Sequence, residues 1–189
     1  MLPFAPTPLL ARIPACLAGL FLAASISLAH AQTMPEIQRL MKQGQLPQAL
    51  AKADLYIAAR PREAQGRFMK GLILTEMGRA DEAIATFTRL TEDFPELPEP
   101  YNNLAVLHAR LKQYDKALAA LEMAIRAHPD YAVAYENLGD IHAKLASQAY
   151  EKALQLDAAN KSARTKATQI SGMINAPIKT DAKPTAAAQ

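Results

Sequence analysis

One stretch of the sequence, Pro98 to Tyr131, decides the fold, and it reads PEPYNNLAVLHARLKQYDKALAALEMAIRAHPDY. Residues suited to a buried face recur in both halves at spacings of three and four, which predicts two helices. They are Tyr101, Leu104, Ala105, His108 and Leu111 in the first half, and Ala117, Leu118, Leu121, Ala124 and Ile125 in the second. Between them lies a short polar turn, where Asp115 is placed to cap the second helix. Pro129 then stops that helix, so the stretch is one helix–turn–helix unit.

The same pattern recurs when the frame is shifted by 34 residues. Four sets of positions keep the phase: Ala49, Ala83 and Ala117; Pro61, Pro95 and Pro129; the turn residues Gly44, Gly78 and Lys112; and the helix-opening residues Pro47, Asp81 and Asp115. Each set has a structural reason, because proline stops a helix or suits its first turn and aspartate suits a helix N-terminus. The chain is therefore predicted to be a tandem array of helical hairpins.

These units resemble the tetratricopeptide repeat, whose first helix carries a large residue, Leu-Gly and an aromatic, and whose second carries Ala-x3-Phe and a closing Pro. The clearest matches are Tyr135-x2-Leu138-Gly139, and Ala83-x3-Phe87 followed by Pro95. The resemblance covers roughly residues 33–160 and implies an all-α superhelix. It also implies that the two helices of a unit approach closely at Gly71, Ala105 and Gly139.

The repeat frame divides the chain into segments. We expect a signal peptide at 1–31, a degenerate first repeat at 32–63, regular repeats at 64–97 and 98–131, a truncated repeat at 132–160, a capping helix at 161–174 and a disordered tail at 175–189. The first helix of the degenerate repeat is expected at about Met34–Lys42. The repeat at 64–97 departs from the family pattern, because Arg67 and Lys70 replace the large apolar residue and the leucine.

Residues 1–31 have the layout of a secretory signal peptide. Arg12 supplies a positive flank, Cys16–Leu28 is an apolar core, and Ala29-His30-Ala31 offers small residues at a cleavage site. An uncleaved inner-membrane anchor at residues 13–31 and a lipoprotein signal at Cys16 are the alternatives. Cleavage before Gln32 predicts a periplasmic or secreted protein without cysteine, and therefore without a disulfide or thiolate metal site.

The truncated repeat lacks the turn between its two helices. Ala146-x3-Tyr150 has the second-helix pattern five residues early, and residues 144–150 contain no Gly or Pro. We therefore expect one continuous helix from about Ala134 to Asp157. Its apolar stripe is predicted to hold Tyr135, Leu138, His142, Leu145, Ala149, Ala153 and Leu156. The capping helix would cover part of its second half, and a second molecule could cover the rest in a homodimer through residues 146–160.

No catalytic, metal-binding or phosphate-binding pattern stands out. The net charge is +3 with acids and bases interspersed, so the sequence offers no basic stripe for nucleic acid. His108 and His142 occupy equivalent positions where the family has an aromatic packing residue, and we expect them to pack in the core. A metal site would need further converging ligands. We expect a non-enzymatic protein without cofactor, metal or small-molecule substrate.

In the tetratricopeptide-repeat family, the first helix of each unit lines a concave groove. Carried onto this chain, the resemblance implies a partner-binding groove of Phe68, Met69, Leu72, Asn102, Asn103, Val106, Arg110, Glu136, Asn137 and Asp140, with Glu76 and Lys144 beside them. Phe68 and Leu72 would be apolar anchors. Asn103 and Asn137 would bind the backbone of an extended peptide, since an Asn amide offers a donor and an acceptor. The alternative is that both asparagines bond a neighbouring helix.

The sequence thus favours a non-catalytic interaction module of the bacterial cell envelope that binds an extended segment of a partner protein. The partner's identity is not encoded in any motif. A self-associating structural protein and a membrane-tethered scaffold are the alternatives. The cluster of Lys, Arg and Asn with which some family members grip a C-terminal carboxylate is absent, because Phe68 and Leu72 stand where it needs polar residues.

Overall fold

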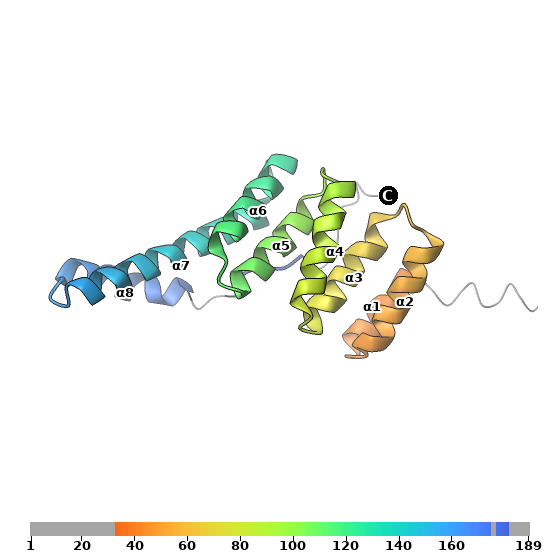
Figure 1. Ribbon diagram of the computed structural model, residues 1–189, viewed down its shortest axis with the longest axis horizontal. Helices are drawn as coiled ribbons and strands as arrows, with labels where there is room; N and C mark the ends of the chain where they lie inside the picture. The colour runs from red at the N-terminus through yellow and green to blue at the C-terminus, as the bar shows by residue number, and fades with distance from the viewer. Residues whose placement is uncertain (1–32, 175–176, 182–189) are drawn as a thin grey trace, which may run out of the picture.

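The computed structural model describes residues 33–174 and 177–181, in which eight α-helices and no strands occur. The helices are α1 (Met34–Lys42), α2 (Leu46–Ala59), α3 (Ala64–Glu76), α4 (Ala80–Asp93), α5 (Pro98–Arg110), α6 (Tyr114–Ala127), α7 (Ala132–Leu156) and α8 (Lys161–Ile174). The first six form three antiparallel hairpins stacked in a row, and α7 with α8 extends from the end of that row as an arm (Figure 1). The predicted all-α repeat superhelix with a long fused helix is confirmed.

The turns inside the three hairpins share one backbone conformation. Gly44, Gly78 and Lys112 all have positive φ angles, of 70°, 72° and 58°. Their 34-residue spacing therefore reflects a left-handed residue that lets each turn reverse direction. Glycine adopts this conformation readily, whereas Lys112 pays for it because its Cβ crowds the following carbonyl.

The expected capping by Asp115 is wrong. Gln113 occupies the N-cap of α6 and no side chain caps that end, while Asp115 lies inside the first turn. Asp81 has the same place in α4. Because the helices begin one residue before these acids, an acid at this site interacts with the positive end of the helix dipole rather than with a backbone N–H.

Close approach within a hairpin is confirmed at Gly71 and is wrong at Gly139. A Cβ built on Gly71 would lie 2.5 Å from Cζ of Phe87 on α4, whereas one on Gly139 meets nothing within 4 Å. Ala105, at the equivalent position of α5, is buried. Gly139 lacks a partner because α7 continues straight past the point where a regular repeat would fold back.

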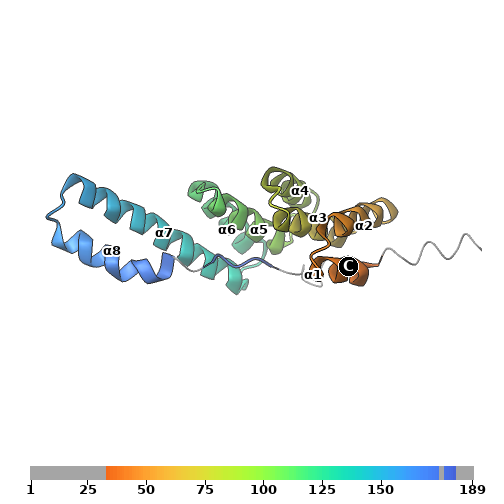
Figure 2. The same cartoon turned by 90° about the horizontal axis from the view of Figure 1, so that it is seen from below.

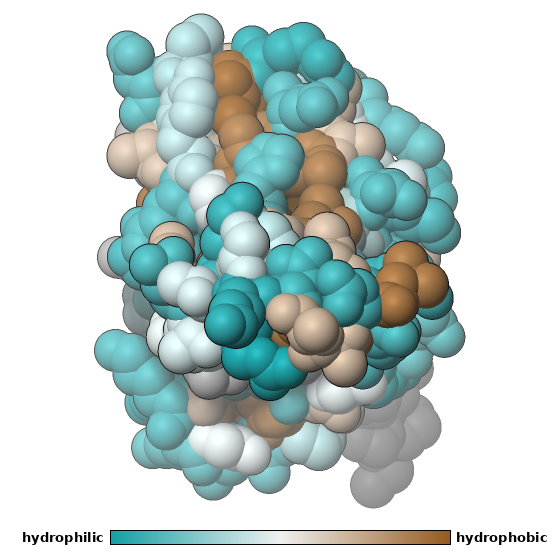
Figure 3. All heavy atoms as spheres, turned by 90° about the vertical axis from the view of Figure 1, so that its left-hand side faces the viewer, coloured by the Kyte–Doolittle hydropathy of each residue, from teal (hydrophilic) through white to brown (hydrophobic). Residues whose placement is uncertain are grey.

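The predicted continuous helix is confirmed by α7, which has 25 residues and is about 37 Å long at the usual rise. Its predicted apolar stripe is buried only in part: Leu138 and Leu145 pack against the core cluster of α5 to α7, whereas His142 is exposed. Its buried residues are Ala134, Asn137, Ile141, Ala143 and Ser147, while Tyr135 and Leu156 are exposed. The buried face differs because the first half of α7 packs on α6 and the second half packs on α8. Apolar surface remains on this end of the molecule as a narrow strip between polar side chains (Figure 3).

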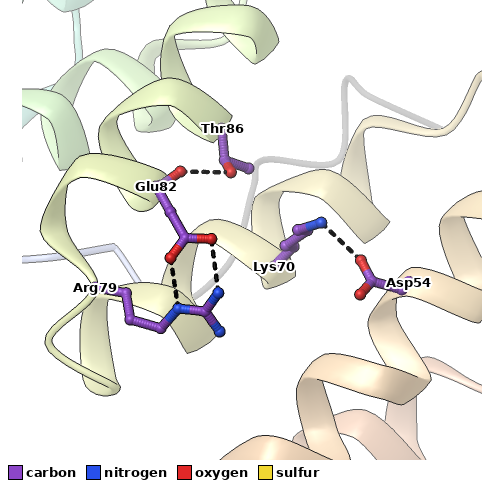
Figure 4. Close-up of polar contacts among 5 residues, drawn as sticks. All are labelled: Asp54, Lys70, Arg79, Glu82 and Thr86. Atoms are coloured by element: carbon purple, nitrogen blue, oxygen red, sulfur yellow. Dashed lines mark hydrogen bonds and ion pairs between the residues drawn. The ribbon is translucent and has the colours of Figure 1, made fainter.

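The two departures from the family pattern in α3 have polar partners. Lys70 reaches Asp54 on α2, with 2.7 Å between Nζ and Oδ1 (Figure 4). Arg67 pairs with Asp93 on α4 and lies over the Phe94 ring. Figure 4 also shows Arg79 bonded twice to Glu82 at the start of α4. Ion pairs at the surface of α3 thus replace the apolar contacts that the family pattern would supply.

The expectation that both histidines pack in the core is wrong. His142 is exposed, and His108 is half-buried with Nδ1 2.9 Å from Oε1 of Gln113. The phase of α7 turns His142 outward, and the polar turn before α6 offers His108 a partner. The expected signal peptide lies outside the described residues.

Candidate functional site

The groove lies on the side of the row that the first helix of each hairpin lines. Residues 177–181 run back from α8 along this side, past the start of α7 and then α5 and α3 (Figure 2). Hollows on both sides of this segment share its residues: Ile178 lines one with α5 and α7, and Asp181 lines another with α1 and α3. For these five residues the expected disordered tail is wrong, because the groove supplies contacts that a polar tail cannot make alone.

The backbone of Lys179 is held at both its polar groups by Asn137. Its N–H donates to Oδ1 of Asn137 at 2.9 Å, and its carbonyl accepts from Nδ2 at 2.8 Å. Asn102 donates from Nδ2 to the same carbonyl at 3.1 Å and accepts from Nδ2 of Asn137 at 2.7 Å. Both asparagines are fully buried beneath the segment. A two-point contact of this kind recognises an extended backbone whatever its side chain is.

Side chains of the segment add three further contacts. Ile178 packs against the core cluster formed by α5, α6 and α7. The ammonium of Lys179 lies 2.7 Å from the Glu136 carboxylate, an exposed ion pair. Oδ2 of Asp181 accepts a hydrogen bond from Nδ2 of Asn102 at 2.6 Å. The groove therefore contacts an apolar, a basic and an acidic side chain in that order.

Asp181 lies in acidic surroundings. Burial raises the pKa of its carboxyl above the usual range; the nearby Tyr131 hydroxyl and the hydrogen bond from Asn102 act in the opposite direction, and the Glu99 carboxylate adds to the rise. Burial likewise raises the pKa of Tyr131. Glu99 and Tyr131 were not expected at the site, and their only sequence signal is their closeness to the helix starts of adjacent repeats.

Three residues of α3 were predicted to line the groove. Met69 and Leu72 do so, whereas the prediction for Phe68 is wrong. Phe68 is fully buried between α3 and α4, edge-on to Phe87 with 5.7 Å between ring centroids, so it offers no anchor. Its position turns it toward the partner helix of its own hairpin. Met69 and Leu72 line an open hollow of about 340 Å³ together with Glu76 and the end of the segment.

Among the groove residues predicted on α5 and α7, some line the groove and others do not. Val106 and Arg110 line a second hollow of about 340 Å³ with Lys144 and Ile178. Asn103 is wrong as a backbone-binding residue, because its amide donates to the Glu99 carbonyl in its own helix at 2.9 Å. Asn102, one residue earlier, takes the place beside Asn137. Asp140 is half-buried, and within the described part of the chain no hydrogen bond or ion pair joins it to residues 177–181.

The described part of the chain offers neither a membrane span nor a metal site. No helix there is both long and apolar enough to cross a membrane. No cluster of three or more His, Cys, Asp or Glu residues there could hold a metal ion.

Comparisons with known proteins identify the family of this chain. Two sequence models described as tetratricopeptide repeat match residues 35–98 and 74–145, which together make up more than half of the chain. The chain belongs to the tetratricopeptide-repeat family. Membership supports a role in protein–protein interaction. The comparison with curated protein sequences yields no match.

Solved structures of tetratricopeptide-repeat proteins share the fold. MamA is 19% identical with a TM-score of 0.54, over 75% of this chain and 88% of its own. A tetratricopeptide repeat protein from Parabacteroides merdae is 19% identical with a TM-score of 0.55, over 74% of this chain and 58% of its own. YrrB, described as a TPR protein with an unusual peptide-binding site, is 29% identical with a TM-score of 0.50, over 53% of this chain and 52% of its own.

Proposed function

We propose that this protein is a non-catalytic interaction module that holds an extended segment of a partner protein in its concave groove. The observation that carries the proposal is the pair of hydrogen bonds between the Asn137 side chain and the backbone of Lys179, since they show how the groove holds an extended chain. The peptide-binding site for which YrrB is described supports the same use of the fold.

The hydrogen bonds of Asn137 define the test. Peptides of ten residues are selected from a random library on the full chain, and their affinities are measured by fluorescence anisotropy. Asn137→Ala is expected to weaken them at least tenfold, because both backbone bonds are lost; parent and variant both carry Ile178→Asp and Lys179→Glu for this comparison, so that the chain's own segment does not compete. Glu122→Ala, an exposed change on α6, is the control and leaves affinity unchanged. Equal affinity for the parent and Asn137→Ala chains would place the binding surface elsewhere and refute the proposal.

We further propose that the module works in the bacterial cell envelope after removal of residues 1–31. The charged flank, apolar core and small-residue site of that stretch support this location. A mass beginning at Gln32 in the exported protein is the expected result. A mass that retains Met1 in a membrane fraction would instead favour the tethered scaffold.

The arm favours self-association as the second candidate function. Leu156 and Met173 are 77% and 57% exposed on α7 and α8, where a second copy could cover them. If the protein dimerises through residues 146–160, inserting Gly-Arg-Tyr-Asp-Glu after Leu145 should yield a monomer by light scattering. A parent chain that stays monomeric at high micromolar concentration would refute the dimer.

A further inference from the structure

The segment at 177–181 occupies the groove in the way expected for a partner. Asn137 forms two hydrogen bonds with its backbone. Its side chains make three further contacts: an apolar contact with the core, an ion pair and a hydrogen bond. The amides of Asn102 and Asn137 are directed at this segment and at each other, and both residues are shielded from solvent. A second extended chain could not form the same bonds while the segment is in place.

We propose that residues 177–181 are a built-in competitor of the groove, and that the partner segment displacing them carries the same order of side chains: apolar, basic, any residue, acidic. This inference rests on the proposed function. The apolar residue replaces Ile178 against the core cluster of α5 to α7. The basic residue pairs with Glu136 as Lys179 does, and the acidic residue accepts from Asn102 as Asp181 does.

The contacts between residues 177–181 and the groove are weak enough for a partner segment to displace them. The ion pair of Lys179 with Glu136 is half-exposed on both sides, and such pairs contribute little to affinity. Ile178 is the single large apolar side chain of the segment. Docking nevertheless persists because the segment is joined to the arm through Ile174, and short tethers give effective concentrations on the order of millimolar. A partner therefore competes against a weak ligand present at high local concentration.

The experiment compares the full chain with a full-chain variant in which the segment is disabled by Ile178→Asp and Lys179→Glu. These changes put one acid against an apolar surface and another against Glu136, while the helices are untouched. The probe is a labelled peptide of residues 175–184, NAPIKTDAKP. We expect it to bind the variant at least tenfold more tightly than the parent chain, and a scrambled peptide to bind neither. Circular dichroism checks that the variant keeps its helix content.

A charge exchange tests the order of side chains. A peptide with Glu in place of Lys179 should bind the variant several-fold more weakly than NAPIKTDAKP. Adding Glu136→Lys to the variant should reverse that preference, because the ion pair is restored with opposite sign. An unchanged preference would show that Glu136 does not read the basic residue, and would overturn that part of the inference.

The outcomes separate this inference from the proposed function. If library-selected peptides bind the parent and the disabled variant equally, the groove is a binding site but the segment is no competitor. If those peptides bind and NAPIKTDAKP binds neither chain, the segment does not represent the partner. If no peptide binds either chain, the proposed function itself fails. Docking of the segment that rises with protein concentration would mean that a second copy supplies it, which overturns the intramolecular competitor.

Discussion

Equivalent residues of different repeats face different surroundings in this molecule, and Gly71 and Gly139 are the clearest pair. Both hold the small-residue position of the family pattern. Phe87 fills the space over Gly71, so any larger residue must displace a buried ring. Nothing lies over Gly139. The glycine is therefore required at one position and merely tolerated at the other.

Alanine at these two positions should change stability in opposite directions. Gly71→Ala is expected to lower the free energy of unfolding by about 1–3 kcal/mol, because overpacking forces Phe87 to move. Gly139→Ala should raise it by roughly 0.5–1 kcal/mol, since alanine loses less backbone entropy inside a helix. Urea denaturation followed by circular dichroism measures both. Equal effects of the two changes would contradict the different surroundings.

Lys112 supports a prediction of its own at the residue scale. It adopts the left-handed conformation that Gly44 and Gly78 adopt in the other two turns. Lys112→Gly should therefore raise the free energy of unfolding by about 1 kcal/mol, as the crowding of its Cβ is relieved. Gly78→Lys is the matched reverse change and should destabilise by a similar amount. A destabilised Lys112→Gly chain would mean that contacts of the lysine outweigh its backbone strain.

At the element scale, the docked segment carries a carboxyl group, Asp181, that is expected to make docking depend on pH. Asp181 faces Asn102 and Glu99 of α5 and the Tyr131 hydroxyl before α7, and it lines a hollow with Lys42 of α1 and Glu76 of α3. Burial raises the pKa of Asp181 in the docked state. A raised carboxyl pKa means that the docked state binds the proton more tightly than the free segment does. Docking is then strongest below the ordinary pKa of aspartate and weakens as pH rises through the raised value.

We expect docking of the segment to weaken, without being lost, as pH rises from the ordinary aspartate range through the raised pKa of Asp181. The NMR signal of the Asn137 side-chain amide reports docking, because both its groups bond Lys179. Asp181→Asn should hold the segment docked across that range, since its amide carries no titrating charge. A pH dependence that survives in Asp181→Asn would assign the effect to another group.

The arm differs from the repeats at the element scale. A missing turn makes α7 continuous, so its second half has α8 as its only cover within the described residues. Only Ala163 of α8 is fully buried. In α5, by contrast, eleven of thirteen residues are buried, because α4, α6, α7 and the docked segment surround it. Stability is thus distributed unevenly along the chain.

At the scale of the whole molecule, this gradient predicts how the protein opens. In a repeat array each unit contacts only its neighbours, so unfolding proceeds from the less covered ends. Amide hydrogen exchange should show the strongest protection in α5 and the weakest in α8. Protection that is uniform from α3 to α8 would contradict this and indicate a single cooperative unit. The Ile178→Asp, Lys179→Glu chain should lose protection at the start of α7 while keeping it in α3.

The 34-residue period of the sequence determined the repeat architecture, because each left-handed turn residue and each closing proline is a local requirement repeated in register. The positive φ of Lys112 and the continuity of α7 follow from such local rules. Residues decided by contacts between helices could not be read in the same way. The repeat period predicts which helix face Phe68, Asn103 and His142 occupy only to within about one residue. A shift of one residue rotates a side chain by about 100° around the helix, which is enough to place it on another face.

The tertiary structure alone decided what the groove holds. Composition marks residues 175–189 as a polar tail that cannot form a core, and Ile178 is the one apolar residue in it that suggests otherwise. Residues 177–181 dock because Asn102 and Asn137, 35 positions apart in the sequence, meet across α5 and α7 and present their amides to one backbone. That meeting depends on the angle at which successive helices pack. A contact between segments some 40 residues apart has no local signature in the sequence, so only the folded chain reveals it.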